Sequence, residues 1–407
     1  MGERDERETG SHHSGGRRRS VRTGAVFAAG AMVAGVAAVG SAAPSQALIG
    51  PGGTHTTARL AAGETIRVLA TNINNMPVNK TPVIVGNVTA VNPAANGHLR
   101  VWNCGADPTR TITVGTGSLF LPDWSTLNYT AGQNTANMVM VDASKNGEVC
   151  IYSSAETDVI FDSTSTFTDG DDGLGSTRRV YDSRAGGAPP VKPGQVVEVQ
   201  TSATGGAPVA LNLIAVNPKS GGHFRVWACD KNMPDTSVVT YRAGQTTSGF
   251  TVSLTSAANA KVCVYTSAEA GIVVDQAGVL SAETLSLLDT PVRLLDTRKT
   301  RTVEAGETVR VTDVTTPAVG TVTAVNPSAA GHLRVWRCDQ SMPGVSSLNF
   351  YPGGNTSNMF VSGHQTNAAG TETCIYSSAR TDIIVDVVGR AGVTVYPYRA
   401  ADTRSMV

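Results

Sequence analysis

The chain has 407 residues, too many for one ordinary domain and enough for about two to four. Its 32 basic residues are balanced by 32 acidic ones, and no Lys/Arg block lies beyond the N-terminal region, which excludes the charge pattern typical of nucleic-acid binding. The 43 glycines, the frequent Thr, Val, Ser and Asn and the few Glu and Lys disfavour long helices. The composition therefore predicts an all-β protein without a nucleic-acid partner.

Residues 1–47 have the pattern of an export signal peptide. A basic stretch, GRRRSVRTG at 16–24, precedes an apolar run of small residues at 25–43 and an A-x-A-like cleavage site, SQA, at 45–47. Arg18 and Arg19 begin a partial twin-arginine pattern, but Arg22 stands where an apolar residue is expected, so both the general secretory and the twin-arginine routes stay open. An uncleaved membrane anchor is the alternative. No second apolar run of this length follows, so we expect a mature chain without a transmembrane segment, secreted or held at the cell surface.

The rest of the chain is one module repeated three times. The segments GNVTAVNPAANGHLRVWNC (86–104), LNLIAVNPKSGGHFRVWAC (211–229) and GTVTAVNPSAAGHLRVWRC (320–338) align, and so do the segments before and after them. We place module 1 at 55–165 with an insertion at 105–126, an acidic, glycine-rich linker at 166–178, module 2 at 179–280 and module 3 at 290–392. A C-terminal segment, 393–407, follows.

Within each module the apolar pattern has a period of two residues, as in a β-strand, and not that of a helix. Segments such as TVTAVNP and HLRVWRC are rich in β-branched and aromatic side chains and are bounded by N-P, G-G or A-G. Several such strands in about 100 residues predict a β-sandwich or jelly-roll-like unit. The expected fold is therefore all-β, with three tandem sandwich-like modules.

Six cysteines fall two to a module. In an exported chain this predicts disulfides, and among the roughly 15 formal connectivities the repetition favours the local one. The expected pairs are Cys104–Cys150, Cys229–Cys263 and Cys338–Cys374. They close loops of about 34 to 46 residues and stabilise each module by about 4 kcal/mol in the chain-entropy model. No C-x-x-C is present, so a zinc site is not expected.

The repeated H-x-R-x-W segment places its three polar or aromatic side chains on one face of a strand, opposite the apolar face. If each disulfide joins neighbouring strands, the Tyr two residues after the second Cys belongs to the same cluster. The predicted clusters are His98, Arg100, Trp102 and Tyr152; His223, Arg225, Trp227 and Tyr265; and His332, Arg334, Trp336 and Tyr376. One interpretation is a ligand-binding platform, on which the rings stack against sugars while Arg and His donate hydrogen bonds. The favoured one is structural: Trp packs on the disulfide with Arg over its ring, or the face is buried between modules.

The motif R-x-x-D-[ST]-R occurs at 179–184, 293–298 and 399–404. A catalytic interpretation makes its Asp a base and its Arg an electrostatic clamp. The favoured interpretation is structural: the Asp accepts backbone donors in a turn, and the Arg that follows it pairs with the acidic residue that ends the module's last strand. The motif residues are Asp182, Arg184, Asp296, Arg298, Asp402 and Arg404, and the expected partners are Asp162, Asp275 and Asp386.

The third copy of this motif has no module after it, and module 1 has no copy before it. Either the motif closes the module that precedes it, or the segment 393–404 crosses to module 1 and supplies its missing opening. In the second case the three modules form a closed pseudo-threefold unit.

Conventional catalytic motifs are not found in the sequence, which has no G-x-S-x-G, no H-E-x-x-H and no phosphate-binding glycine loop. The segment TDGDDGLGS at 168–176 resembles the start of a calcium loop, but Val180 stands where a bidentate carboxylate is required. It is expected to be a flexible linker. We therefore expect no enzyme activity, no metal and no cofactor.

The order of segments R-L-L-D-T-R, A-G, V-T-A-V-N-P, S-x-L-N-F and V-D-V-V-G, best seen between 293 and 389, resembles a β-rich repeat of exported proteins from high-GC Gram-positive bacteria. Module 2 departs from it at Gly249, which stands where module 3 has Asn358, and the cysteine pair and the Trp are additions to the usual pattern. The resemblance implies an accessory module that faces the cell envelope, and the family supplies no catalytic residues.

Together these patterns predict a non-catalytic, secreted or cell-surface protein that binds an envelope component, peptidoglycan or a surface polysaccharide, through weak sites summed over three modules. The first alternative is a structural or protein-interaction component of a surface assembly, with another surface protein as partner. The second is an unrecognised secreted hydrolase. Exposed tryptophans would favour glycan binding, and tryptophans buried at module interfaces would favour the structural role.

Overall fold

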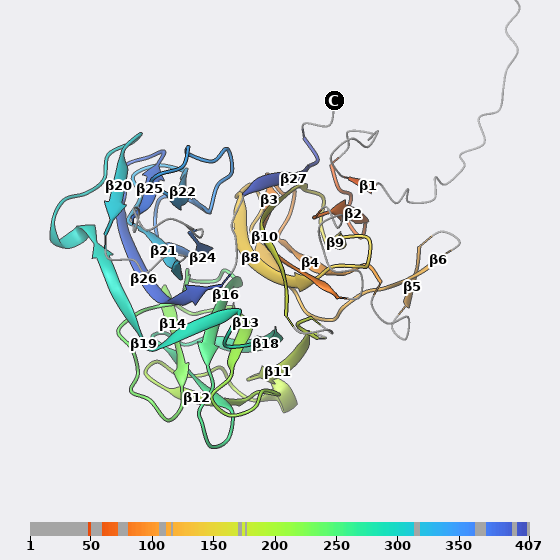
Figure 1. The fold of residues 1–407 in the computed structure, drawn as a ribbon, viewed down its shortest axis with the longest axis horizontal. Helices are drawn as coiled ribbons and strands as arrows, with labels where there is room; N and C mark the ends of the chain where they lie inside the picture. Colours follow the sequence, from red (N-terminus) through yellow and green to blue (C-terminus); the bar gives the residue numbers. More distant parts are fainter. Residues whose placement is uncertain are drawn as a thin grey trace, which may run out of the picture. The chain divides into compact units, whose positions relative to one another are not determined.

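The computed structural model describes residues 48–49, 59–71, 80–105, 111–114, 117–169, 173–175, 177–312, 318–362, 372–392 and 397–404. The predicted export signal, 1–47, lies outside these residues. In the described part, the regular structure is β-strand apart from two short 3-10 turns, Ala185–Gly187 and Thr297–Lys299 (Figure 1). The prediction of an all-β fold is confirmed.

Each module consists of two sheets that enclose an apolar core to which both contribute. In module 2 the sheets are β11 (Arg178–Asp182), β18 (Gly271–Val279), β13 (Pro208–Val216) and β16 (Thr247–Leu254), and β12 (Val196–Gln200), β17 (Lys261–Thr266), β14 (Gly222–Ala228) and β15 (Val239–Tyr241). In module 3 they are β19 (Leu285–Asp296), β26 (Asp382–Ala391), β21 (Ala318–Val325) and β24 (Thr356–Val361), and β20 (Thr308–Val311), β25 (Thr373–Ser377), β22 (Gly331–Arg337) and β23 (Leu348–Phe350).

Module 1 follows the same plan with additions. Its sheets are β27 (Tyr398–Asp402), β10 (Asp158–Thr168), β3 (Pro82–Val91) and β8 (Thr135–Asp142), and β1 (Leu48–Ile49), β2 (Thr65–Leu69), β9 (Glu148–Ser153), β4 (Gly97–Asn103) and β7 (Leu127–Tyr129). The predicted insertion contains a hairpin, β5 (Thr111–Val114) with β6 (Gly117–Phe120). The strand β1 pairs in parallel with β2 at the edge of the second sheet.

The period-two pattern of the sequence is obeyed in the strands. In β22, Leu333 and Val335 lie in the core of module 3, whereas His332 and Arg334 are half-buried on the other face. The three V-N-P segments turn at their Asn, which has φ of 46°, 44° and 47° at Asn92, Asn217 and Asn326. Asn tolerates this left-handed conformation better than most residues, which accounts for its presence at the end of each strand.

The opening strand of module 1 comes from the C-terminal end of the chain. The strand β27 pairs antiparallel with β10, as β11 pairs with β18 in module 2 and β19 with β26 in module 3. In Figure 1, β27 lies at the edge of the sheet that contains β10 and β3, away from the strands that precede it in the chain. Ala400 and Ala401 of β27 are 5% and 3% exposed and belong to the core of module 1. The segment therefore completes module 1, and not module 3.

Each module contacts the other two in one cyclic order. The strand β7 of module 1 contacts β16 of module 2, β15 of module 2 contacts β24 of module 3, and β23 of module 3 contacts β8 of module 1. Side chains from β3, β8, β13, β16, β21, β24 and β26 also form one apolar cluster common to the three modules. The arrangement is pseudo-threefold.

At each of two module interfaces, a hydrogen bond between two asparagines links the modules. Asn137 of module 1 donates to Asn212 Oδ1 of module 2 at 3.0 Å, and Asn358 of module 3 donates to Asn87 Oδ1 of module 1 at 2.9 Å. At the third interface, Gly249 and Thr321 stand in place of the two asparagines. A Cβ at Gly249 would lie 2.6 Å from Val239 Cγ2, so the smaller residue is required there.

Two boundaries differ from those expected from the sequence. The strand β19 begins at Leu285, before the expected start of module 3 at 290, because Leu285 pairs with β26 and is buried. The expected linker 166–178 is partly built into the fold, since β10 continues to Thr168 and Leu174 lies in the common apolar cluster.

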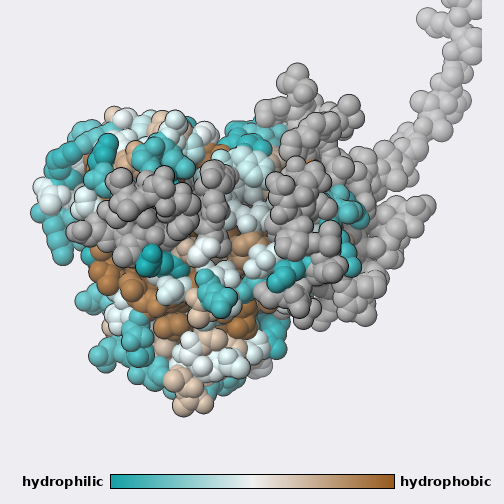
Figure 2. Space-filling model, in the orientation of Figure 1, coloured by the Kyte–Doolittle hydropathy of each residue, from teal (hydrophilic) through white to brown (hydrophobic). Residues whose placement is uncertain are grey.

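Exposed apolar side chains gather at the border of modules 2 and 3. On the face shown in Figure 2, apolar surface lies over the region where Figure 1 places β16 and β19. Leu288 and Val292 of β19 are 41% and 46% exposed. Lys231 of module 2 reaches β19 through an ion pair with Asp289, 3.3 Å between Nζ and Oδ2.

Candidate functional site

The three predicted disulfides form within their modules, as Cys104–Cys150, Cys229–Cys263 and Cys338–Cys374. In each module the strand carrying H-x-R-x-W is paired with the strand of the second cysteine. The register places Trp opposite that cysteine and Arg opposite Tyr in all three. The predicted clusters are therefore brought together.

The tryptophans of these clusters are buried. Trp102, Trp227 and Trp336 are 3%, 8% and 8% exposed. Trp102 contacts its own disulfide together with Leu121 and Trp124, which come from the end of the insertion. The tryptophan side chains are thus almost entirely buried, and in module 1 the residues that cover Trp102 belong to its own module.

The arginines of the clusters hold the loops that follow the first cysteine. Arg225 Nη1 donates to the carbonyl of Pro234 at 2.9 Å, Arg334 Nη1 donates to that of Pro343 at 3.1 Å, and Arg100 Nη1 makes the equivalent bond to Pro122. The guanidinium carbons lie 5.2, 5.4 and 5.7 Å from the ring centres of Tyr152, Tyr265 and Tyr376. The structural interpretation expected Arg over Trp, but the cross-strand register puts the cation over Tyr.

The histidines sit beside the same tyrosines. Ring centres are 6.0 Å apart in each module, for the pairs His98–Tyr152, His223–Tyr265 and His332–Tyr376. Burial and the neighbouring Arg100 lower the pKa of His98 to about 4, and burial likewise lowers the pKa of the other two. These imidazoles are therefore neutral at physiological pH and can accept a hydrogen bond. Arg100 Nε donates to His98 Nε2 at 3.1 Å.

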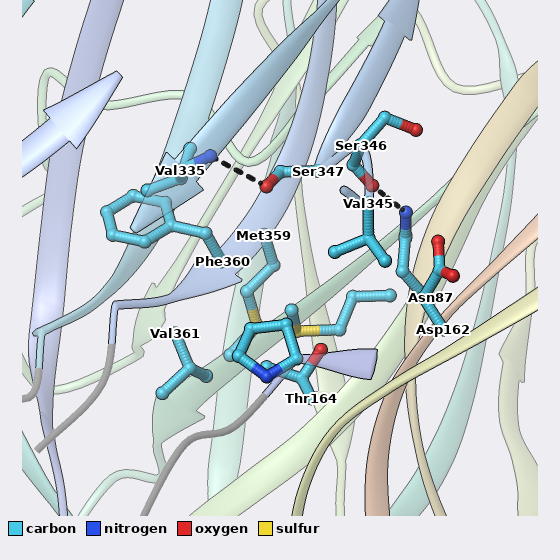
Figure 3. A pocket seen from close by; sticks show the side chains of 12 residues that line it. Asn87, Asp162, Thr164, Val335, Val345, Ser346, Ser347, Met359, Phe360 and Val361 are labelled. Atoms are coloured by element: carbon cyan, nitrogen blue, oxygen red, sulfur yellow. Dashed lines mark hydrogen bonds between the residues drawn. The ribbon is translucent and has the colours of Figure 1, made fainter. Parts of the chain in front are cut away.

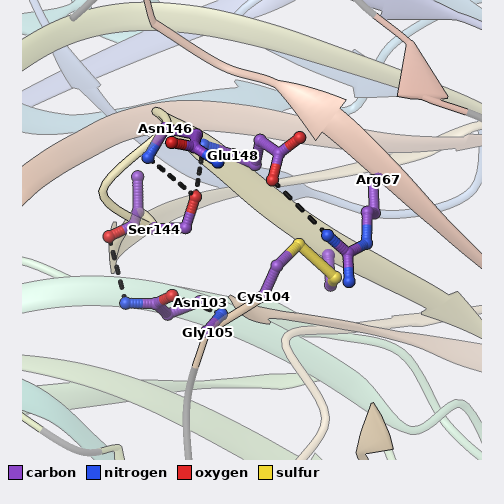
Figure 4. Close-up of a disulfide and its surroundings, with 9 residues drawn as sticks. Arg67, Asn103, Cys104, Gly105, Ser144, Asn146 and Glu148 are labelled. Carbon is purple, nitrogen blue, oxygen red and sulfur yellow. Dashed lines mark hydrogen bonds and ion pairs between the residues drawn. A yellow bond between two sulfur atoms is a disulfide. The ribbon is translucent and has the colours of Figure 1, made fainter. Parts of the chain in front are cut away.

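Polar side chains around the first disulfide are bonded to the backbone (Figure 4). Asn103 Nδ2 donates to the carbonyl of Ala143 at 3.0 Å, and its Oδ1 accepts from the amide of Gly105 at 2.8 Å. Ser144 Oγ accepts from the amides of Asn146 and Glu148. These bonds fix the backbone close to both cysteines of the bridge.

A cleft lies beside Trp336 in module 3. It has a volume of about 330 Å³ and includes Arg337, Gln340, Met342 and Pro397 in its lining. Met342 is 44% exposed, while Trp336 donates its indole N–H to the carbonyl of Gln340 at 3.1 Å. The cleft is within the size range of small-molecule sites.

The R-x-x-D-[ST]-R motif forms the same ion pairs in every module. Its first Arg pairs with the buried Asp of the neighbouring strand: Arg179 with Asp275 at 2.8 Å, Arg293 with Asp386 at 2.7 Å and Arg399 with Asp162 at 2.6 Å. Its second Arg pairs with the motif's own Asp: Arg184 with Asp182, Arg298 with Asp296 and Arg404 with Asp402. The Arg that follows the motif Asp was expected to reach the buried carboxylate, but the leading Arg does so.

The remaining motif residue caps a strand. The hydroxyls of Ser183, Thr297 and Thr403 accept from the amides of Ile272, Ile383 and Val159, at 2.8, 2.8 and 3.0 Å. In modules 2 and 3, hydrogen bonds from the second Arg hold the pKa of Asp182 and Asp296 below the usual range, and burial raises the pKa of Asp275 and Asp386. Every polar group of the motif therefore has a partner inside its module.

A small cavity lies between modules 1 and 3 beside Asp162 (Figure 3). Its volume is about 20 Å³, which is room for about one water. Asn87 donates to the carbonyl of Ser346 at 2.9 Å on its wall, while Asp162 Oδ2 is buried without a protein partner. Burial raises the pKa of Asp162 to about 6 in spite of its bond to Arg399.

The described residues contain no group of three His, Cys, Asp or Glu side chains placed to hold a metal ion. Within the same part of the chain, no helix is long and apolar enough to cross a membrane.

The sequence matches no known family model and no curated protein. Among solved structures it is similar to the major capsid protein P2 of bacteriophage PM2, with 11% identity over 54% of this chain and 97% of that chain and a TM-score of 0.26. It is also similar to the triple jelly-roll protein of an archaeal virus (9% identity, 81% and 83% covered, TM-score 0.20) and to a protein of Sulfolobus turreted icosahedral virus (9%, 81% and 84%, 0.18). Likeness at this level identifies neither a shared topology nor a shared function.

Proposed function

We propose that this protein is an exported, non-catalytic structural or protein-interaction component of a surface assembly. The observation that carries the proposal is that the side chains shared by the three modules are used inside the modules. The Trp rings are buried, the Arg groups bind loop carbonyls and Tyr rings, and the Asp–Arg motifs pair with each other.

The location at the surface rests on the signal-like N-terminal segment, the resemblance to envelope-associated repeats and the three disulfides. Disulfides persist in oxidising compartments, which agrees with export. The exposed apolar side chains of β19, Leu288 and Val292, are a surface that another protein could cover.

The test is retention of the mature protein, residues 48–407, on purified cell walls from the source bacterium. One batch of walls keeps its proteins, and a second has been stripped of them with protease. The proposal expects retention on the first batch and loss on the second. Retention on stripped walls would contradict it, and so would the absence of binding to either batch.

Envelope-glycan binding is the second candidate function, and the cleft beside Trp336 is the observation that favours it. Trp-to-Ala variants are poor probes, because removing a buried ring costs about 3–5 kcal/mol and disturbs the fold. Met342 and Met233 provide a matched pair instead, since they occupy the same position in modules 3 and 2 and are 44% and 43% exposed. If the cleft binds glycan, Met342→Glu lowers retention on stripped walls and Met233→Glu does not. Equal retention of both variants would remove this candidate.

A further inference from the structure

A polar depression lies where the three modules meet. It is lined by the ends of β7, β15 and β23 and by the loops after them, which occupy equivalent positions in the three repeats at 130–135, 242–247 and 351–356. We call it the axial depression. Its volume is about 60 Å³, enough for several waters and therefore for a carboxylate group.

The lining of the axial depression carries a positive charge. Among the residues that the structure describes, its lining consists of Asn, Gln, Thr and Tyr side chains and the guanidinium of Arg242, without an Asp or Glu. Arg242 donates to the carbonyls of Tyr351, Pro352 and Gly354 of module 3, at 2.6, 3.0 and 3.1 Å. Burial lowers its pKa, and in the described part of the chain no neighbouring charge offsets this effect.

Arg242 differs in this respect from the arginines of the repeated motif, each of which faces a carboxylate within 3 Å. A half-buried cation that is bonded to carbonyls alone keeps its full charge uncompensated. An anion in the depression would supply the missing charge, and hydrogen bonds to an ionised partner are the strong ones.

One residue of the wall carries a donor that has no partner within the protein. Asn349 of β23 lines the depression, and its Nδ2 is buried without a hydrogen-bond partner in the protein. A buried donor left unpaired is costly, so an acceptor beside it is favourable. The corresponding residues of the other two modules, Asn128 and Thr240, line the same depression.

We propose that the axial depression binds a carboxylate, as a small carboxylic acid or as the carboxylate of an acidic saccharide. The position of Arg242 is taken by Thr130 in module 1 and by Tyr351 in module 3, so the site exists only in the assembled unit and has one orientation. The inference is independent of the proposed structural role, because it concerns a ligand and not a protein partner.

The experiment is a titration of the isotope-labelled mature protein with sodium glucuronate and sodium acetate, followed by the NMR shifts of the Asn349 side-chain amide and the Arg242 Nε–H. Saturable shifts of both groups are expected. Glucose and sodium chloride at equal concentration should leave them in place. Shifts that do not saturate, or that glucose reproduces, would overturn the proposal. Polygalacturonate serves as the polymer arm, and tighter binding of it per residue than of glucuronate would identify a saccharide source.

Three variants separate charge from structure. Neither Gln nor Lys has the planar guanidinium that donates to three carbonyls at once, and only the lysine keeps the charge. We expect Arg242→Gln to weaken glucuronate binding about tenfold or more, and Arg242→Lys to retain most of it. Lys192→Gln removes an exposed positive charge of the same module outside the depression and should have no effect. Equal affinities of the Gln and Lys variants would show that Arg242 acts only as a structural link.

Discussion

The C-terminal strand β27 is expected to stabilise module 1 by an amount that can be estimated from its ion pair. Arg399 of β27 pairs with Asp162 of β10, 2.6 Å between Nε and Oδ1, and Asp162 is 1% exposed. Arg399→Met leaves a buried carboxylate without its cation, and breaking a buried pair in this way costs about 3–5 kcal/mol. We expect a loss of this size in the free energy of unfolding at pH 8, confined to module 1.

The measurement is urea unfolding combined with amide hydrogen exchange resolved by peptide. Protection should fall in residues 82–91 and 158–168, which are β3 and β10, while module 3 keeps its exchange rates. Arg293→Met is the matched control, since Arg293 makes the equivalent pair with Asp386 at 2.7 Å. It should lower protection in module 3 instead.

Deletion of 397–407 tests the same reasoning more severely. The deletion removes the ion pair, the buried Ala400 and Ala401, and the hydroxyl of Thr403 that accepts from the amide of Val159. Limited proteolysis should then cut module 1 first. If the first cuts fall in residues 285–392, the assignment of β27 to module 1 does not describe the protein in solution.

Three further predictions follow from the buried polar groups. Because burial raises the pKa of Asp162 to about 6, the stabilising contribution of its protonated form is complete below about pH 4 and is lost as the pH rises through 6. The urea midpoint of unfolding, measured from pH 4 to 8, should therefore change less with pH in Asp162→Asn than in the parent protein. An unchanged pH dependence would refute this. Asn358→Gly should lower the free energy of unfolding by about 2 kcal/mol. Adding Asn87→Thr, which reproduces the Gly and Thr of the interface between modules 2 and 3, should recover about 1 kcal/mol in a double-mutant cycle. If the effects of the two substitutions simply add, the two asparagines do not interact. The imidazole of His98 should stay neutral down to about pH 5 in an NMR titration, and a midpoint above 6 would contradict its burial.

The fold class and the disulfides were predictable because repetition reduces the alternatives. Three copies of one pattern make local cysteine pairs the simplest solution, and period-two alternation identifies the core faces, as for Leu333 and Val335. The path of the C-terminal segment could be stated only as one of two options, since the motif matches the edge of any module. Pairing of β27 with β10 decides between them.

Alternation of polar and apolar residues could not predict whether the His, Arg, Trp and Tyr clusters are exposed or buried. The face opposite a core is exposed to solvent in a single sheet, but here the loop after the first cysteine covers it. The carbonyls that bind the arginines belong to Pro122, Pro234 and Pro343, which recur in the three modules after Leu or Met, but alternation does not show that the loop folds back over the strand. The leading Arg of the motif was also missed. Its signal was present, because Arg179, Arg293 and Arg399 recur at the same spacing from the motif Asp.

The axial depression could not be predicted from the sequence, for a different reason. Its lining comes from equivalent loops of three modules, and each loop by itself is an ordinary polar turn. Arg242 could be recognised only from the structure, because the carbonyls that it binds belong to module 3, more than 100 residues away in the chain.

The pairing of β27 with β10 also fixes an order of events during biosynthesis. Arg399 and Asp162 are separated by 237 positions, so the module that is made first must wait until the other two have been synthesised before its first sheet is complete. Contacts of such long range form slowly, and an unpaired strand edge is prone to wrong pairing. The chain therefore stays incompletely folded during most of its synthesis, and the last strand to arrive completes the first module.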